Sequence, residues 1–166
     1  MPRVLIADDE ESMRTLVARA VAMDGHDIVT AEDGAEALEI LSQQPGAFDL
    51  LLTDIKMPIM DGIALALAAA RDFPDLTILL MTGFADQRER AHGLSAIVHD
   101  VVTKPFSVAD IRTAVAAALA AFGQSAREAI ATTAAIGDAD TSDLFTEISR
   151  GVDHQLWFVE SHAAPQ

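Results

Sequence analysis

The stretch LLLTDIKMPIMDG, residues 50–62, joins a continuous aliphatic run to a carboxylate, Asp54, and then to a turn-forming segment. A second aliphatic run, ILLM, occupies residues 78–81. Strands that are apolar at every position are typical of parallel sheets, because helices cover both faces of such sheets. The two runs therefore predict a parallel sheet with strands that are buried on both faces.

Segments of strand length and of helix length alternate outward from this stretch. Five apolar runs of strand length are found at Arg3–Ala7, Ile28–Ala31, Asp49–Thr53, Leu76–Thr82 and Ile97–Thr103. Segments of helical character lie between and after them, at residues 13–21, 37–41, 63–70, 86–94 and from the N-cap Ser107 to Phe122. Five strands that alternate with five helices predict an α/β fold, a doubly wound parallel sheet.

The composition of the chain limits its class. The chain has 166 residues, of which 51% are hydrophobic, enough for the core of one ordinary domain with a small appendage. The absence of Cys excludes a disulfide framework and a thiolate metal site. Its 26 acidic and 11 basic residues give a net charge of −15, which argues against direct DNA binding. Because we find no membrane span and no signal peptide in the sequence, we expect a cytoplasmic protein.

Polar residues follow four of the predicted strands at the point where each strand ends. Asp8 and Asp9 follow the first strand, Asp54 the third, Thr82 the fourth and Lys104 the fifth. A doubly wound sheet binds its ligand at the carboxyl ends of its strands. Any one of these residues taken alone is more often a turn or helix-cap residue. Four strand ends with complementary chemistry indicate a site.

The chemistry of these residues favours a cation and a phosphoryl group. Clustered carboxylates repel one another by about 4 kcal/mol per pair at 4 Å and an effective dielectric constant near 20, so a proton or a cation must join them. Oxygen ligands without His or Cys favour Mg²⁺. Lys104 adds a positive charge and Thr82 a hydroxyl group. Asp54 is then placed to attack phosphorus while Mg²⁺ and Lys104 neutralise the phosphoryl oxygens.

These residues and their surroundings closely resemble the response-regulator receiver domain (CheY-like). The resemblance covers about residues 3–122 and is carried by Asp8-Asp9, DIKMPIMDG from Asp54, Thr82-Gly83 and Lys104-Pro105-Phe106. It implies a flavodoxin-like five-stranded sheet of order 2-1-3-4-5. It also implies a cis peptide bond between Lys104 and Pro105, which would direct the lysine side chain towards the site.

The resemblance further implies a role for each site residue. Asp54 is expected to be the phospho-acceptor. Asp9 and Asp54 would bind Mg²⁺ directly, the backbone carbonyl of Lys56 would be a third ligand, and Asp8 would act through water. Thr82 would be the switch hydroxyl and Lys104 the phosphate partner.

The sequence departs from the family pattern at Val101. The family usually has Tyr or Phe three residues before the conserved lysine, where the ring moves inward on activation; here that position is Val101. The sequence at residues 81–91 and 99–106 is most similar to that of regulators from alphaproteobacteria. Some of these are stand-alone receivers of the CpdR type, which control proteolysis by an ATP-dependent protease.

The resemblance implies a phosphorylation-dependent signalling switch. A histidine kinase or phosphotransfer protein would donate the phosphoryl group, and a downstream protein would bind the face formed by residues 86–122. This face is locally basic on an otherwise acidic protein, because it carries Arg88, Arg90, His92 and Arg112. These residues could equally be a solvated helix surface. We expect no enzymatic activity beyond the domain's own phosphorylation and dephosphorylation. The alternative is a constitutive interaction module in which the receiver is a scaffold.

Residues 123–166 form a separate helical tail in this interpretation. Two helices are expected, at Ala126–Ile136 and from about residue 141, the second with an apolar stripe at Leu144, Ile148, Val152, Leu156 and Val159. The tail is similar to the C-terminal end of the ferritin-like Dps family at residues 127–130, 143–150 and 156–162. Because that family takes its iron ligands from helices that this chain lacks, we assign no iron oxidation. The stripe could pack on the receiver, pair with a second copy or stay loosely ordered.

Overall fold

The computed structural model describes residues 1–83, 89–91 and 93–135, and for residues 122–135 it describes the backbone alone. The helix expected from about residue 141, its apolar stripe and most of the Dps-like stretch therefore lie outside the described residues. Of the helix expected at 86–94, residues 86–88 and 92 also lie outside the described residues. Residues 89–91 are helical, whereas Gly93 and Leu94 belong to a turn.

The sheet has the predicted architecture. Its five strands are β1 (Arg3–Ala7), β2 (Asp27–Ala31), β3 (Leu50–Asp54), β4 (Thr77–Thr82) and β5 (Asp100–Thr103). They pair in the order β2-β1-β3-β4-β5, and every pair is parallel. The flavodoxin-like order that the resemblance implied is confirmed.

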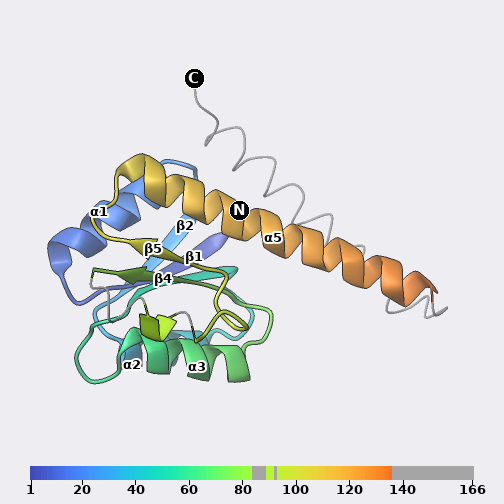
Figure 1. Cartoon of the computed structure of the whole chain (residues 1–166), viewed down its shortest axis with the longest axis horizontal. Helices are drawn as coiled ribbons and strands as arrows, with labels where there is room; N and C mark the ends of the chain where they lie inside the picture. The colour runs from blue at the N-terminus through green and yellow to red at the C-terminus, as the bar shows by residue number, and fades with distance from the viewer. Residues whose placement is uncertain (84–88, 92, 136–166) are drawn as a thin grey trace.

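Within the described part of the chain, four long helices cover the two faces of the sheet (Figure 1). They are α1 (Glu11–Ala22), α2 (Gly34–Gln43), α3 (Gly62–Asp72) and α5 (Val108–Ala135). Helices α1 and α5 lie on one face, and α2 and α3 on the other. Successive residues of β3 point to opposite faces, so Leu51 packs in the α2–α3 layer whereas Leu50 and Leu52 pack in the α1–α5 layer. Because all three are fully buried, the aliphatic run behaves as predicted.

Side-chain caps fix where three helices begin. Asp33 and Asp61 accept hydrogen bonds from the backbone N–H groups of Glu36 and Ala64, at 2.8 Å each, and so start α2 and α3. At α5 the Ser107 hydroxyl accepts the Asp110 N–H at 3.0 Å while the Asp110 carboxylate accepts the Ser107 N–H at 2.8 Å. This reciprocal pair is a capping box, and it confirms Ser107 as the predicted N-cap.

Strand β5 and helix α5 differ most in structural consequence from their predicted boundaries. Strand β5 begins at Asp100 rather than Ile97, because residues 93–97 form turns in which Leu94 O accepts the N–H groups of Ile97 and Val98, at 2.9 Å each. Helix α5 does not end at Phe122 but runs unbroken to Ala135, so it includes most of the segment predicted as a separate helix. One glycine in an alanine-rich helix costs only about 1 kcal/mol, too little to end it. None of the described helices is long and apolar enough to cross a membrane.

An ion pair ties α5 to the loop that follows α1. Arg112 donates to both carboxylate oxygens of Asp24, with distances of 2.6 to 3.2 Å. The Asp24 side chain is 1% exposed and that of Arg112 is 23% exposed. The pair therefore joins residues that are 88 positions apart in the chain, and it holds the two helices side by side on one face of the sheet.

Candidate functional site

Three carboxylates meet at the carboxyl ends of β1 and β3. Asp8, Asp9 and Asp54 each offer an oxygen within 4.8 Å of the other two; we call these residues the acidic cluster. Asp8 is fully buried, Asp54 is 8% exposed and Asp9 is exposed. Because β1 pairs directly with β3, in a register that aligns Ala7 with Thr53, the strand ends carry these residues to one place.

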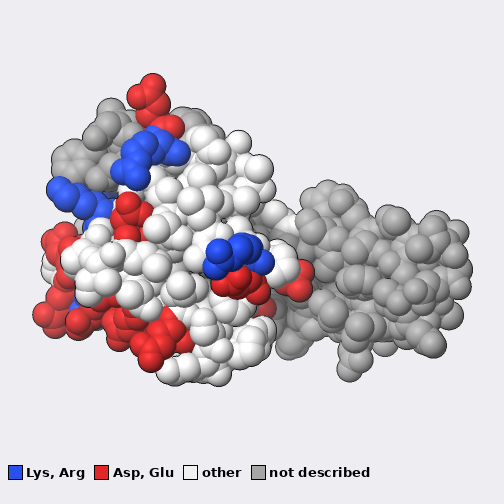
Figure 2. All heavy atoms as spheres, turned by 90° about the horizontal axis from the view of Figure 1, so that it is seen from below, with Lys and Arg blue, Asp and Glu red and all other residues white. Residues whose placement is uncertain are grey.

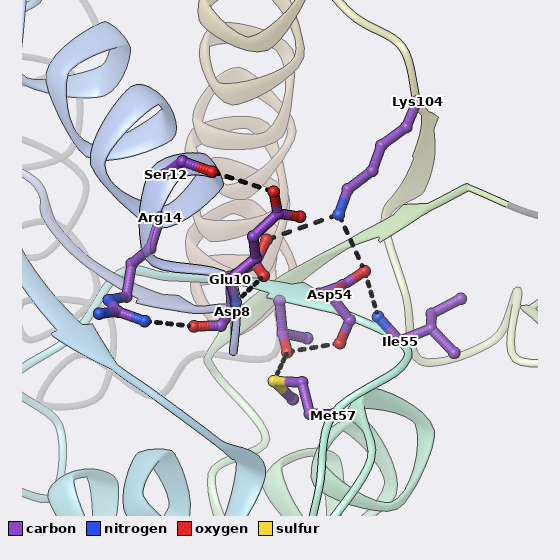
Figure 3. A network of polar contacts seen from close by, with 9 residues as sticks. Asp8, Glu10, Ser12, Arg14, Asp54, Ile55, Met57 and Lys104 are labelled. Carbon is purple, nitrogen blue, oxygen red and sulfur yellow. Dashed lines mark hydrogen bonds and ion pairs between the residues drawn. The ribbon is translucent and has the colours of Figure 1, made fainter.

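The loop after β1 is held by hydrogen bonds to Asp8. The Glu10 N–H donates to Asp8 Oδ1 at 3.0 Å, and the Arg14 guanidinium donates to the Asp8 carbonyl at 2.8 Å. Arg14 also lies 3.8 Å from a carboxylate oxygen of Glu32, at the end of β2. Figure 3 shows Arg14 and Ser12 of α1 beside this loop. The first turn of α1 thereby fixes the buried carboxylate relative to the sheet.

Lys104 reaches into the acidic cluster from the end of β5 (Figure 3). Its Nζ lies 3.5 Å from Asp8 Oδ2 and 3.3 Å from Asp54 Oδ1, and its side chain is 19% exposed. Its backbone N–H donates to the carbonyl of Thr82 at 2.7 Å, which joins the ends of β4 and β5. The peptide bond between Lys104 and Pro105 is cis, as the resemblance implied.

The electrostatics of the site oppose the charge on its buried carboxylates. The pKa of Asp54 is raised to about 6. Burial is the largest cause and the negative charge of Asp8 adds to it, whereas Lys104 and the Ile55 N–H act in the opposite direction. Burial likewise raises the pKa of Asp8, against the lowering effects of the Glu10 N–H and Lys104. The single positive charge of Lys104 does not balance the negative charges of the acidic cluster, so a further cation would reduce the repulsion among them.

The donor set fits a hard divalent cation. All three members of the acidic cluster offer carboxylate oxygens, which Mg²⁺ prefers. Asp8 Oδ2 is buried, and among the described residues it has no hydrogen-bond donor, only the ion pair with Lys104. A buried anionic oxygen in that state is what a cation or its bound water would satisfy.

The loop after β3 packs tightly on Asp54. The N–H of Ile55 donates to Asp54 Oδ1 at 3.0 Å, and the N–H of Gly62 donates to the Ile55 carbonyl at 2.7 Å. A Cβ atom at position 62 would lie 2.0 Å from the Asp54 carbonyl oxygen, so only glycine allows this approach. The loop thus holds Asp54 from the backbone side and leaves its carboxylate facing Asp8 and Lys104.

Two other predicted site residues lie at the same edge of the sheet. Thr82 is fully buried at the end of β4, and its register partner on β5 is Thr103. Lys56 lies two residues after Asp54 and is exposed. Their roles as switch hydroxyl and carbonyl ligand stay predictions. Val101 is half-buried on β5 and packs against the α2–α3 layer.

Sequence reasoning missed Arg14, Thr53 and Gly62 as parts of this site. Arg14 lies near the start of α1. Side chains in a helix lean towards its N-terminus, so this position could have indicated that Arg14 contacts the preceding loop. Thr53 precedes Asp54 and was read only as a strand residue, although its hydroxyl donates to the Asp54 carbonyl at 2.9 Å. Gly62 was read as part of a turn.

Of the four basic residues named for the face at residues 86–122, the structure describes two, and both are paired with carboxylates. Arg112 is engaged with buried Asp24, so its charge is largely neutralised within the fold. Arg90 lies 3.6 Å from a carboxylate oxygen of Asp61, the N-cap of α3. Arg88 and His92 lie outside the described residues.

Acidic side chains also surround the site. Figure 2 shows Asp and Glu gathered at the end of the molecule away from the projecting part of α5. Glu10, Glu11 and Glu32 contribute exposed carboxylates at the ends of β1 and β2. Their summed negative potential draws cations to this end of the sheet.

Comparison with known proteins gives the family of this fold and site. Residues 4–116 match the model of the response regulator receiver domain. The chain belongs to this family. Receiver domains work in two-component systems, where histidine kinases or phosphotransfer proteins phosphorylate them, and they bind Mg²⁺ at an acidic site. The matched residues end before the tail, so the resemblance of the tail to Dps receives no support from them.

Individual relatives agree with the family match. The chain is 40% identical to the response regulator receiver protein CpdR of Brucella abortus over 111 residues, which are 67% of this chain and 91% of that protein. It is 31% identical over 125 residues to the transcriptional regulatory protein PrrA of Mycobacterium tuberculosis, covering 75% of this chain. It spans only about half the length of that regulator, 53%.

A solved receiver structure agrees as well. The response regulator TrrA of Thermotoga maritima, solved with Mg²⁺ and BeF, shares 31% identity and a TM-score of 0.62. The similarity covers 69% of this chain and 96% of that one.

Proposed function

We propose that this receiver accepts a phosphoryl group on Asp54 from a histidine kinase or a histidine phosphotransfer protein, in a Mg²⁺-dependent reaction. The single observation that carries the proposal is the setting of Asp54. Its carboxylate belongs to the acidic cluster, and the ammonium group of Lys104 lies 3.3 Å away. This arrangement combines a nucleophilic oxygen with the positive charge that a phosphoryl group needs.

The reaction divides among the residues of the site. An oxygen of Asp54 forms a bond to phosphorus while the bond from phosphorus to the donor imidazole breaks, and the imidazole nitrogen keeps the electron pair. Lys104 then moves from the carboxylates to the phosphoryl oxygens, where it neutralises charge. Asp9 and Asp54, with Asp8 acting through water, would hold Mg²⁺, which would supply further positive charge at those oxygens. In this proposal the backbone carbonyl of Lys56 completes the ligand set.

The signal leaves the site through the ends of β4 and β5. Thr82 and Lys104 are joined through their backbones; Thr82 lies just before the proposed output face, residues 86–122, and Lys104 lies within it. A Thr82 hydroxyl that turns towards the phosphoryl group would shift this junction. The downstream partner would then be a protein that distinguishes the face before this shift from the face after it. We assign the chain no other enzymatic activity.

Beryllofluoride, a mimic of a bound phosphoryl group, tests this proposal. With Mg²⁺ and beryllofluoride, we expect the amide resonances of residues 82–106 to shift in the full chain and to stay unchanged in Asp54→Asn. Asp75→Asn, an exposed carboxylate remote from the acidic cluster, is the matched control and should respond as the unmodified chain does. A spectrum that does not change would overturn the switch and favour the constitutive scaffold instead.

A further inference from the structure

One peptide group, that between Asp54 and Ile55, donates a hydrogen bond to the Asp54 carboxylate. Its N–H donates to Asp54 Oδ1 at 3.0 Å and also lies 3.1 Å from the carbonyl oxygen of Met81 on β4. Figure 3 shows the Ile55 nitrogen directed at the Asp54 carboxylate, on the side opposite Lys104. The orientation of this peptide plane therefore helps to set the orientation of the carboxylate.

The carbonyl of the same peptide group is held by Thr53. The Thr53 hydroxyl donates to the Asp54 carbonyl oxygen at 2.9 Å, and Thr53 is fully buried. Because a peptide group is planar, fixing its carbonyl oxygen also fixes the direction of its N–H. The Thr53 hydroxyl, the Asp54–Ile55 peptide and the Asp54 carboxylate thus form one continuous chain of contacts.

The surroundings keep the Thr53 hydroxyl in this position. As a β-branched residue, Thr53 has few accessible χ1 rotamers, and Met57 Sδ lies 4.0 Å from its Oγ1. Gly62 closes the other side of the Asp54 carbonyl. A buried carbonyl that lost its donor would tilt to find another partner, and the N–H of the same peptide would tilt with it.

We propose that Thr53 is a positioning residue for the phospho-acceptor: its hydroxyl fixes the peptide plane after Asp54 and, through the Ile55 N–H, aims the Asp54 carboxylate at the incoming phosphorus. This inference rests on the proposed function for its effect on rate. Misplacement of a nucleophile by a fraction of an ångström slows attack, because the reacting atoms must approach in line.

Three substitutions in the full chain separate the hydroxyl from the packing. Thr53→Val removes the hydroxyl at nearly constant volume, Thr53→Ser keeps it, and Thr77→Val makes the same exchange at the amino end of β4, remote from the site. With acetyl phosphate and Mg²⁺, we expect Thr53→Val to be phosphorylated about tenfold more slowly than the unmodified chain. Thr53→Ser should stay within about twofold of it, as should Thr77→Val. Thr53→Ala gives a second hydroxyl-free variant should the valine not fold.

The amide resonance of Ile55, measured without phosphodonor, is the second readout. It should move in Thr53→Val and stay near its original position in Thr53→Ser, a difference that a general loss of stability would not produce. Thr53→Val phosphorylated at the unmodified rate, or serine and valine variants that are equally slow, would overturn the inference. If the unmodified chain itself is not phosphorylated, the proposed function fails, and an Ile55 resonance that is unmoved in Thr53→Val then refutes the positioning as well.

Discussion

Asp54 is held in a setting that opposes its own charge. Burial and the neighbouring Asp8 raise its pKa to about 6, and the opposing effect of Lys104 does not cancel this. In the unfolded chain the same carboxyl group titrates near its ordinary value of about 3.9. Between these two values the folded state binds more protons than the unfolded state, so this group makes the fold less stable as the pH rises from about 4 to about 6.

Asp54→Asn should therefore stabilise the Mg²⁺-free protein at neutral pH. We expect the free energy of unfolding at pH 7.5 to rise by about 1–3 kcal/mol, because the variant removes a charged form that the fold disfavours. The difference in free energy of unfolding between the variant and the unmodified chain should decrease towards pH 4.5. Added Mg²⁺ should also decrease this difference at neutral pH, because it stabilises the unmodified chain. Urea unfolding at several pH values, with and without Mg²⁺, measures this. If Asp54→Asn is less stable than the unmodified chain at pH 7.5, the raised pKa of Asp54 is contradicted.

Lys104 competes with a cation for the same oxygens. Its Nζ lies within 3.5 Å of both Asp8 and Asp54, so it partly neutralises the acidic cluster and repels a divalent ion. Lys104→Met should therefore bind Mg²⁺ about three- to tenfold more tightly, as measured by calorimetric titration. Arg71→Met, which removes an exposed positive charge paired with Asp72, should leave the affinity unchanged. Weaker binding in Lys104→Met would show that the lysine supports the site rather than competes for it.

At the scale of elements, the ion pair between Arg112 and Asp24 helps to hold α5 beside α1, in addition to apolar packing between the two helices. Arg112→Leu should lower the free energy of unfolding by about 2–3 kcal/mol, because it leaves the buried carboxylate of Asp24 without its partner. Chemical denaturation measures this, with Arg71→Met, the loss of an exposed pair, as a control that should show no measurable change. Equal effects of the two substitutions would mean that the buried pair is no more important than an exposed one.

The strand ends were the most predictable part of the molecule. The aliphatic runs required burial on both faces, and a parallel sheet brings its carboxyl ends to one edge, so Asp8, Asp54 and Lys104 could be placed together from sequence alone. The start of β5 could not be predicted, because Ile97 and Val98 are as apolar as strand residues although their N–H groups close a turn on Leu94. Periodicity does not distinguish these two uses of apolar residues.

The missed contacts of the site share a different cause. The hydrogen bond of Thr53 runs to the carbonyl of its own neighbour, and the close approach of Gly62 depends on how the loop turns after Asp54. Both follow from dihedral angles of one loop, which residue types restrict but do not determine. The predicted end of α5 at Phe122 was wrong, because one glycine, Gly123, costs too little to end the helix.

At the scale of the whole molecule, the receiver core ends well before α5 does. Among the α5 residues whose side chains the structure describes, up to position 121, those buried in the core are Ile111, Val115, Ala118 and Leu119, and the backbone of the helix continues to Ala135 (Figure 1). A chain that ends after Ala121 should therefore fold and be phosphorylated as the full chain is. This agrees with the boundary near residue 122 that we predict between the receiver and its tail.

Denaturation of two truncated chains tests this boundary. The chain ending after Ala121 should unfold at nearly the same urea concentration as the full chain. A chain ending after Ala117, which also lacks the buried Ala118 and Leu119, should lose about 2–4 kcal/mol of stability. If both truncations unfold alike, with a large loss, the tail contributes to the core and the predicted boundary is wrong.

The central claim, that Asp54 is the residue that accepts the phosphoryl group, is tested most directly by mass spectrometry of the full chain after incubation with acetyl phosphate and Mg²⁺. We predict the mass gain of a single phosphoryl group, located by peptide mapping to Asp54. This gain should not appear when EDTA removes Mg²⁺ before the acetyl phosphate is added, and it should be absent in Asp54→Asn. A phosphoryl group on another residue, or undiminished labelling of Asp54→Asn, would contradict the account.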